Sequence, residues 1–291
     1  MNTSSTPINL REAIKQLDSL PALPFIAQKL LTLQTDTDEG QRQLLSLIGQ
    51  DPQILARIIG LANSPSLGTS RKISSISEAA IVLGINRIKS VATGIAIMSL
   101  QSGSSTGTLN LQDLWMHNLG IAFAMLAIGR AMPRQIRPAD DYIFLAGMLH
   151  DIGYIALDHL DPQRSNELHT YMAATPNRSV LEIEHSLLDI CHDELGAELA
   201  RHWNLPKEII SVIRYHHTPD VADAPKDQPL IRMVYVAEKM LPSFGMGEHV
   251  DAGIQDSDWE ALGIAPANAE EIIIQAAEQA DQAALFAANL G

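Results

Sequence analysis

The sequence predicts an all-α protein, and three observations favour that fold class. Aromatic residues make up only 4% of the 291 residues, while Ala, Leu and Ile are abundant, a composition that suits close-packed helices better than sheets. Helix-capping signals recur along the chain. Alternating apolar and polar runs joined by hairpin turns, the pattern of strands, are absent from the sequence. We therefore expect helices throughout.

The first hundred residues carry the clearest helix boundaries. Asp51 precedes a proline in QDPQILARIIGLANS, the pattern of an N-cap followed by proline at the first helical position. Ser75 and Glu78 have the spacing of a capping box, and Gly84 is placed to end that helix. A further helix is expected in NRIKSVATGIAIMSL, residues 86–100.

The stretch QSGSSTGTLN, residues 101–110, interrupts this pattern. Its Gly, Ser and Thr content predicts a flexible connector, where proteases should cut before they attack the flanking helices. It contains GSSTG, a formal match to the GxSxG nucleophile motif around Ser105. That motif requires a strand before the serine and a helix after it. A connector that follows a helix does not provide them, so a serine hydrolase is not expected.

Helical patterns resume after the connector and continue to the end of the chain. Helices are expected at about 111–130, 141–157, 179–188, 192–204, 206–217 and 228–241, followed by one short helix and one long amphipathic helix in the C-terminal stretch. We therefore expect a two-lobed helical bundle. Its parts are an N-terminal helical lobe at 1–100, the linker at 101–110, a second helical lobe at 111–245 and a C-terminal helical extension at 246–291.

Charge and cysteine content exclude several classes of protein. Twenty basic residues against 34 acidic ones give a net charge of −14, which argues against direct nucleic-acid binding and against an anionic membrane surface. The single cysteine, Cys191, excludes an internal disulfide and fits a reducing compartment. The longest apolar run, at 119–129, is shorter than the roughly 20 residues of a membrane span. A cytoplasmic protein is expected.

A set of histidines and carboxylates recurs in the second half of the chain. Imidazole and carboxylate together suit first-row divalent metals, and the set lacks HExxH spacing, so a site would have to be assembled across several helices. The candidate metal ligands are His117, His150, Asp151, His192, His216, His217 and Glu238. The alternative is a group of core histidines hydrogen-bonded to backbone carbonyls. Adjacent His216 and His217 would point about 100° apart on a helix, so both are not expected to serve one ion.

Several motifs of the chain resemble the HDOD family, a relative of the HD superfamily of metal-dependent phosphohydrolases. The first half carries LPALPFIAQKLLTL, IGQDPQILARIIGLANS and ISSISEAAIVLGINRIKSV. The second half carries LWMHN, FLAGMLHDIG, CHDELGAELARHWNLP and HHTP. The resemblance covers about residues 15 to 240, and its motifs occur in the order of the family.

The resemblance implies an all-α module of bacterial signalling proteins, with an N-terminal helical lobe and an HD-like second lobe, usually regarded as lacking hydrolase activity. It also implies that the candidate ligands would hold a divalent metal such as Fe, Mn or Zn. Many relatives have lost most of these ligands, whereas this sequence keeps most of them. Asp113, four residues before His117, could stand where some cyclic-dinucleotide hydrolases have an extra acidic ligand.

Three departures from related cyclic-di-GMP phosphodiesterases argue against catalysis. Tyr154 stands where those enzymes have a lysine after the HD pair, and a phenol does not supply a cation to phosphate. The Gly-Tyr-Pro motif after the paired histidines is missing, and Glu238 replaces an aspartate. We expect a non-catalytic output module that binds a signalling protein or a small ligand such as a nucleotide. The alternative is a metal-dependent phosphohydrolase acting on cyclic dinucleotides or nucleotides.

Overall fold

The computed structural model describes residues 9–16, 20–63, 72–101, 109–225, 228–241 and 253–288. Within these ranges every regular element is a helix, which confirms the predicted fold class. The first lobe contains α2 (Phe25–Thr32), α3 (Asp38–Gly49), α4 (Pro52–Ala62), α5 (Ile76–Leu83), α6 (Ile85–Met98) and the short 3-10 helix η3 (Ser99–Gln101), and it is preceded by α1 (Leu10–Ala13). The predicted connector and Ser105 fall at 102–108, outside the described residues.

The second lobe is larger and also wholly helical within the described ranges. Its helices are α7 (Leu111–Ala131), α8 (Asp140–Leu149), α9 (Ile152–Leu160), α10 (Pro162–Ala174), α11 (Val180–Leu188), α12 (His192–His202), α13 (Lys207–Tyr215) and α14 (Pro229–Met240). The C-terminal extension contains α15 (Asp256–Ala261), the 3-10 helix η4 (Pro266–Asn268) and α16 (Ala269–Ala288).

The capping signals of the first lobe are confirmed. The Asp51 carboxylate accepts hydrogen bonds from the backbone N–H groups of Gln53 and Ile54, both at 3.0 Å, and Ser75 caps α5 through the N–H of Glu78. Gly84 ends α5 with φ of +85°, a conformation that glycine adopts without strain. Because α6 begins at the next residue, the two helices meet at a bend of 115°.

None of the described helices is by itself long and apolar enough to cross a membrane, although α5 and α6 taken together reach that length and apolarity.

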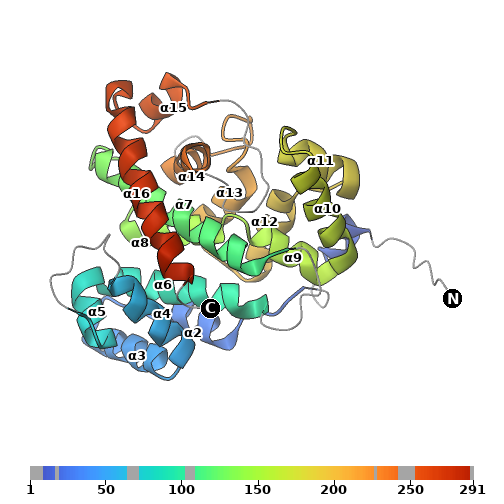
Figure 1. The fold of residues 1–291 in the computed structure, drawn as a ribbon. Helices are drawn as coiled ribbons and strands as arrows, with labels where there is room; N and C mark the ends of the chain where they lie inside the picture. Colours follow the sequence, from blue (N-terminus) through green and yellow to red (C-terminus); the bar gives the residue numbers. More distant parts are fainter. Residues whose placement is uncertain are drawn as a thin grey trace.

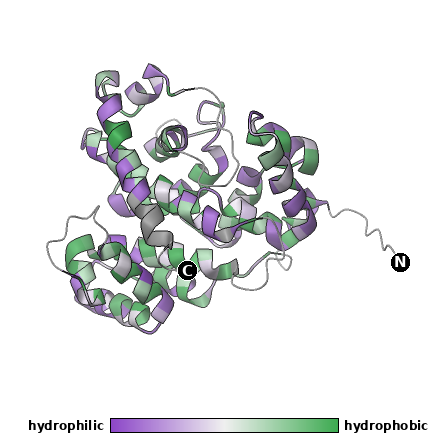
Figure 2. Cartoon of the chain, viewed as in Figure 1, coloured by the Kyte–Doolittle hydropathy of each residue, from purple (hydrophilic) through white to green (hydrophobic). Residues whose placement is uncertain are grey.

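The long helix α7 forms the centre of the second lobe. Helices α8, α14 and α16 pack against it, and α16 crosses it along much of its length (Figure 1). Outer helices carry both hydrophobic and hydrophilic residues (Figure 2), whereas α8 is buried on all sides over 143–149. The buried apolar residues form one continuous core from α1 to α16. Met148 of α8, for example, lies against Gly94 of α6 and joins the two lobes.

Three helix boundaries differ from the sequence-based expectation. The helix expected at 141–157 is broken, since α8 ends at Leu149 and α9 begins at Ile152. Helix α10 was not predicted, although Asp161 caps it and a proline follows, the same signal that marked α4. Helix α13 ends at Tyr215 rather than at 217. Two of these three differences lie at candidate ligands, where the chain leaves the helix to place a side chain.

Candidate metal centre

The seven candidate ligands converge on one buried point in the second lobe. They come from five places in the chain, and each side chain is no more than 5% exposed. Their positions are the middle of α7 for His117, the break between α8 and α9 for His150 and Asp151, the first residue of α12 for His192, the end of α13 for His216 and His217, and α14 for Glu238.

Two glycines allow the helices to approach closely enough for this convergence. A Cβ on Gly147 would lie 2.4 Å from Cα of Ala122, so α8 packs directly on α7 and brings His150 beside His117. A Cβ on Gly153 would lie 1.8 Å from the carbonyl oxygen of His192, so α9 packs on the start of α12. No side chain fits at either crossing.

Asp151 lies between two groups of imidazoles. Its Oδ2 atom is 3.2 Å from Nε2 of His150 and 3.4 Å from Nε2 of His117. Its Oδ1 atom is 3.4 Å from Nε2 of His192 and 3.5 Å from Nε2 of His216. The two carboxylate oxygens therefore face two different sets of nitrogen atoms.

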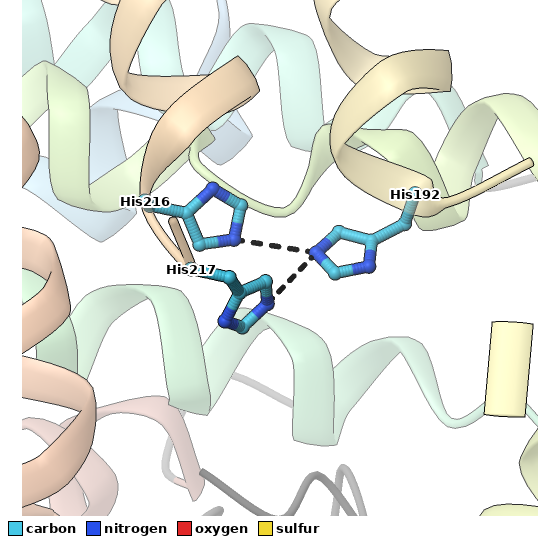
Figure 3. A group of neighbouring side chains, drawn as sticks. All are labelled: His192, His216 and His217. Carbon is cyan, nitrogen blue, oxygen red and sulfur yellow. Dashed lines mark hydrogen bonds between the residues drawn. The ribbon is translucent and has the colours of Figure 1, made fainter. Parts of the chain in front are cut away.

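His216 and His217 both face His192, as Figure 3 shows. Each has its Nε2 atom 3.2 Å from Nε2 of His192. The expectation that neighbouring histidines point apart assumed a continuous helix, and it is wrong here because α13 ends at Tyr215. His217 lies in the following turn, and its ring reaches the same point as that of His216.

Glu238 reaches the same centre from α14. Its Oε1 atom is 3.4 Å from Nε2 of His150, and its Oε2 atom is 3.4 Å from Nδ1 of His217. The longer side chain of glutamate therefore contacts both groups of imidazoles, as Asp151 does.

Backbone carbonyls fix the proton positions on two of the rings. The Nδ1 atom of His150 is 2.8 Å from the carbonyl oxygen of Gly147, and Nδ1 of His216 is 2.9 Å from that of Ile213. A carbonyl oxygen only accepts hydrogen bonds, so each Nδ1 carries the proton that it donates. A ring that carries no second proton therefore presents the lone pair of its Nε2 atom to the centre.

Glu184 performs the same task for His192, and no motif in the sequence indicates this role. Its Oε1 and Oε2 atoms are 2.8 and 2.9 Å from Nδ1 of His192, and its Oε2 atom accepts a bond of 2.9 Å from the backbone N–H of His192. The residue lies on α11 and is fully buried. It stands eight residues before His192 outside any motif, so only the packing of α11 on the start of α12 reveals it.

The centre leaves buried carboxylate oxygens without hydrogen-bond partners. Among the described residues, this holds for both carboxylate oxygens of Asp151 and both of Glu238. Burial opposes charge here, yet the Asp151 and Glu238 carboxylates raise the pKa of His150 to about 10. Burial likewise disfavours the Glu238 carboxylate, but His217 and His216 lower its pKa to about 2. The first shift favours a positive charge on His150, and the second favours the negative charge on Glu238.

The donor set and its spacing fit a divalent metal. Two ligand atoms at about 2.0–2.1 Å from one ion, at tetrahedral or octahedral angles, lie about 3.0–3.4 Å apart, and the three Nε2 to Nε2 distances are 3.2 Å. Three combinations of these ligands are suited to a metal ion: His192, His216 and His217; His117, His150 and Glu238; and Asp151, His216 and Glu238. Imidazole with carboxylate is the chemistry that iron, manganese and zinc accept.

Two further residues singled out in the sequence have different surroundings. Tyr154 is fully buried, and its ring stacks on that of His192 with centroids 4.5 Å apart and planes 19° apart. Asp113 does not join the cluster. It lies half-buried at the start of α7, where burial raises the pKa of its carboxyl against a hydrogen bond with Asn110.

Comparison with known proteins places this geometry in a family. The HDOD domain model matches residues 20–219. The chain belongs to the HDOD family. A relative from Treponema pallidum (strain Nichols), an uncharacterized protein, is 30% identical over 230 residues, which cover 76% of this chain and 42% of the relative. The chain therefore spans less than half the length of this curated relative.

Solved structures share the HDOD fold. An HDOD domain protein of unknown function from Geobacter sulfurreducens is 26% identical, with a TM-score of 0.72 and coverage of 93% of this chain and 98% of that one. A candidate signal transduction protein from Marinobacter aquaeolei VT8 has a TM-score of 0.80 at 23% identity, covering 97% of this chain and 65% of that one. A candidate metal-dependent phosphohydrolase from Shewanella amazonensis SB2B has a TM-score of 0.64 at 20% identity, covering 94% and 97%. The last two similarities concern the fold alone.

Proposed function

We propose that this HDOD protein is a non-catalytic output module of bacterial signal transduction, with a divalent metal held in its buried cluster. The supporting observation is that no candidate ligand has a side chain more than 5% exposed. A catalytic metal site keeps a position open to water and substrate, whereas the side chains of this cluster are almost entirely buried.

Tyr154 supports the same conclusion. A phosphodiesterase stabilises the charge on phosphate with a cation near the metal, and the buried phenol stacked on His192 supplies none. The ring instead fills space beside the cluster. In this proposal Tyr154 packs the HD-like lobe rather than contacting a substrate.

The metal would be iron, manganese or zinc, because these ions accept mixed imidazole and carboxylate ligands. When bound, the metal would neutralise the negative charges of Asp151 and Glu238. It would also connect α7, α8, α12, α13 and α14 at one point. The ligands of this centre would be His117, His150, Asp151, His192, His216, His217 and Glu238.

The activity is tested by a turnover assay. Pure protein is incubated with Mn²⁺ or Fe²⁺ and with cyclic-di-GMP, cyclic-di-AMP, cAMP or nucleotides, and we expect no sustained hydrolysis. Turnover that disappears in both His150→Ala and Asp151→Ala, but persists in the exposed control His185→Ala, would overturn the proposal.

A metal-dependent phosphohydrolase is the second candidate, because all seven candidate ligands are present and converge. In that case the cluster would arrange the metal and an attacking water, and a movement of the helices would have to expose it. The same assay decides between the two functions.

We expect the module to act by binding a signalling protein. Large apolar side chains on the first lobe support this part of the proposal, since Phe25 is 70% exposed and Ile81 is 80% exposed. We expect the protein to capture a signalling partner from an extract of its source cell, and Ile81→Asp to reduce that capture. Reproducible capture by neither form would contradict the partner.

A further inference from the structure

A pocket of about 450 Å³ lies where α15 packs beside α14 (Figure 1), and the loop that follows α13 forms its rim. Its volume falls within the roughly 300 to 1,000 Å³ that is typical of small-molecule sites. Eight of its ten lining residues follow position 219, where the HDOD match ends. The pocket is therefore built mainly from the part of the chain outside the family match.

The walls of the pocket are aliphatic. Ile136, Val221, Pro225, Pro229 and Ile231 line it, and the first two are large apolar side chains that remain exposed to solvent. None of its lining residues is aromatic. A nucleobase would stack on an aromatic ring, so these walls suit a hydrocarbon body better than a base.

The charged groups at the pocket carry an excess negative charge. Arg232 pairs with Asp220 through both of its terminal nitrogens, and it also donates a bond of 2.8 Å to Asp258. One guanidinium thus faces two carboxylates. Asp220 lines the pocket and is largely exposed, so it can accept a further hydrogen bond. The charge balance favours a ligand that brings one positive charge.

Gln228 adds an unmade hydrogen bond to the same pocket. It is the residue before α14, and its buried Oε1 atom has no hydrogen-bond partner among the described residues. A buried acceptor without a donor costs free energy. A half-turn of the amide exchanges its oxygen and nitrogen with little change of shape, so the oxygen can face the pocket. A ligand with an N–H or O–H group would supply the missing donor.

We propose that this pocket is a binding site for a small aliphatic amine. Its hydrocarbon body would lie against Ile136, Val221 and Ile231. Its amine is protonated at neutral pH, as that of lysine is, and would donate to Asp220 and Gln228. The site goes beyond the proposed function, because it needs neither the metal nor a protein partner.

The experiment is an NMR titration of the methyl-labelled full chain, in chelator, with hexylamine, hexanol and hexanoate, which share one alkyl chain. The methyl signals of Ile136, Val221 and Ile231 should shift. Hexylamine should bind about fivefold more tightly than hexanol, the size of effect that a solvent-exposed ion pair provides, and hexanoate should bind most weakly. High salt should reduce the advantage of hexylamine over hexanol.

Two variants test the polar contacts. Asp220→Asn should abolish the preference for hexylamine over hexanol. Its control Asp223→Asn changes an exposed carboxylate of the same loop that does not line the pocket, and should keep the preference. Gln228→Met removes the amide at similar length, so it should weaken hexylamine and hexanol equally, because both molecules donate a hydrogen bond.

A third variant tests the pocket itself. Ala261 is an exposed residue at the end of α15 and lines the pocket, so Ala261→Leu should fill the space without unfolding the chain and abolish binding of both molecules. Its control Ala265→Leu adds the same group at an exposed position outside the pocket and should bind as wild type does. Melting curves show whether each variant is folded.

The outcomes separate this inference from the proposed function. Methyl shifts outside the pocket only, equal affinity for hexylamine and hexanoate, or wild-type binding by folded Ala261→Leu would each overturn the amine site. Because chelator is present throughout, none of these results bears on the metal centre. Absence of metal from the wild-type protein would overturn that centre and leave the amine site in place.

Discussion

The two lobes fill their interiors in different ways. In the described residues of 20–101, the buried polar side chains are Ser90 and Thr93, and Thr93 donates a hydrogen bond to the carbonyl oxygen of Lys89. The second lobe buries at least eight ionisable side chains in its described residues. These are His117, His150, Asp151, Glu184, His192, Asp193, His216 and Glu238.

This difference indicates what each lobe needs in order to be stable. The first lobe buries few polar side chains, so its stability rests mainly on apolar packing. The second lobe contains buried carboxylate oxygens that have no hydrogen-bond partner among the described residues, and a buried polar group without a partner costs free energy. If the proposed metal supplies that partner, the stability of the second lobe should depend on metal, whereas the first lobe should be indifferent to it.

The largest effect is expected at the crossing of α9 and α12. In Gly153→Ala the new Cβ would lie 1.8 Å from the carbonyl oxygen of His192, so the helices must separate, at a cost of more than about 3 kcal/mol. Metal binding should be lost as well, because the separation moves Asp151 away from His192. Urea unfolding and elemental analysis measure the two effects.

The first lobe offers a matched control for this change. Gly49, the last residue of α3, has no atom within 4 Å of its would-be Cβ. Gly49→Ala should therefore be neutral or stabilise the protein by up to about 1 kcal/mol, with metal content unchanged. Loss of metal in Gly49→Ala, or a wild-type metal content in Gly153→Ala, would contradict the comparison.

Truncating a core side chain in the first lobe should destabilise the protein by an amount that does not depend on metal. Ile58 of α4 is fully buried, so Ile58→Ala should lower the free energy of unfolding by about 3 kcal/mol through lost contacts and a cavity. The loss should be the same with and without chelator, provided the chain unfolds in one step. If the loss of unfolding free energy depended on chelator, bound metal would stabilise the first lobe as well as the second.

Sequence reasoning succeeded where the signal is local. Asp51 and Ser75 cap their helices as predicted, because a cap depends on a few neighbouring residues. It failed at the break between α8 and α9, where an apolar run conceals the point at which His150 and Asp151 leave the helix. The early end of α13 at Tyr215 was missed for the same reason.

The candidate site shows the same division. The seven candidate ligands were found from residue types and order, and whether they bind metal stays a prediction. Glu184 was not found, because its role depends on the contact of α11 with the start of α12 rather than on any spacing. The role of Gly153 was likewise not indicated by any sequence pattern, although the close packing of α9 on α12 at this glycine brings Asp151 near His192.

Removing metal should destabilise the protein by an amount that depends on metal concentration. Binding to the native state alone contributes about 2.7 kcal/mol when free metal is at 100 times its Kd, so chelation should lower the melting temperature by several degrees. Mn²⁺, Fe²⁺ or Zn²⁺ should restore it. His150→Ala should melt at the same temperature in either condition, while the exposed control His185→Ala should behave as wild type.

The smallest effect is expected at the cap of α4. Asp51 accepts two backbone hydrogen bonds at 3.0 Å, so Asp51→Ala should lower the free energy of unfolding by about 1 kcal/mol. Asp36→Ala removes the same charge from an exposed position before α3 and should have little effect. Because the cap lies in the lobe that buries no ionisable group in its described part, the loss should be equal with metal and with chelator in urea unfolding. If the stability lost in Asp51→Ala differed between metal and chelator, the stability of the first lobe would depend on the metal centre. The two lobes would then differ only in how strongly each depends on metal.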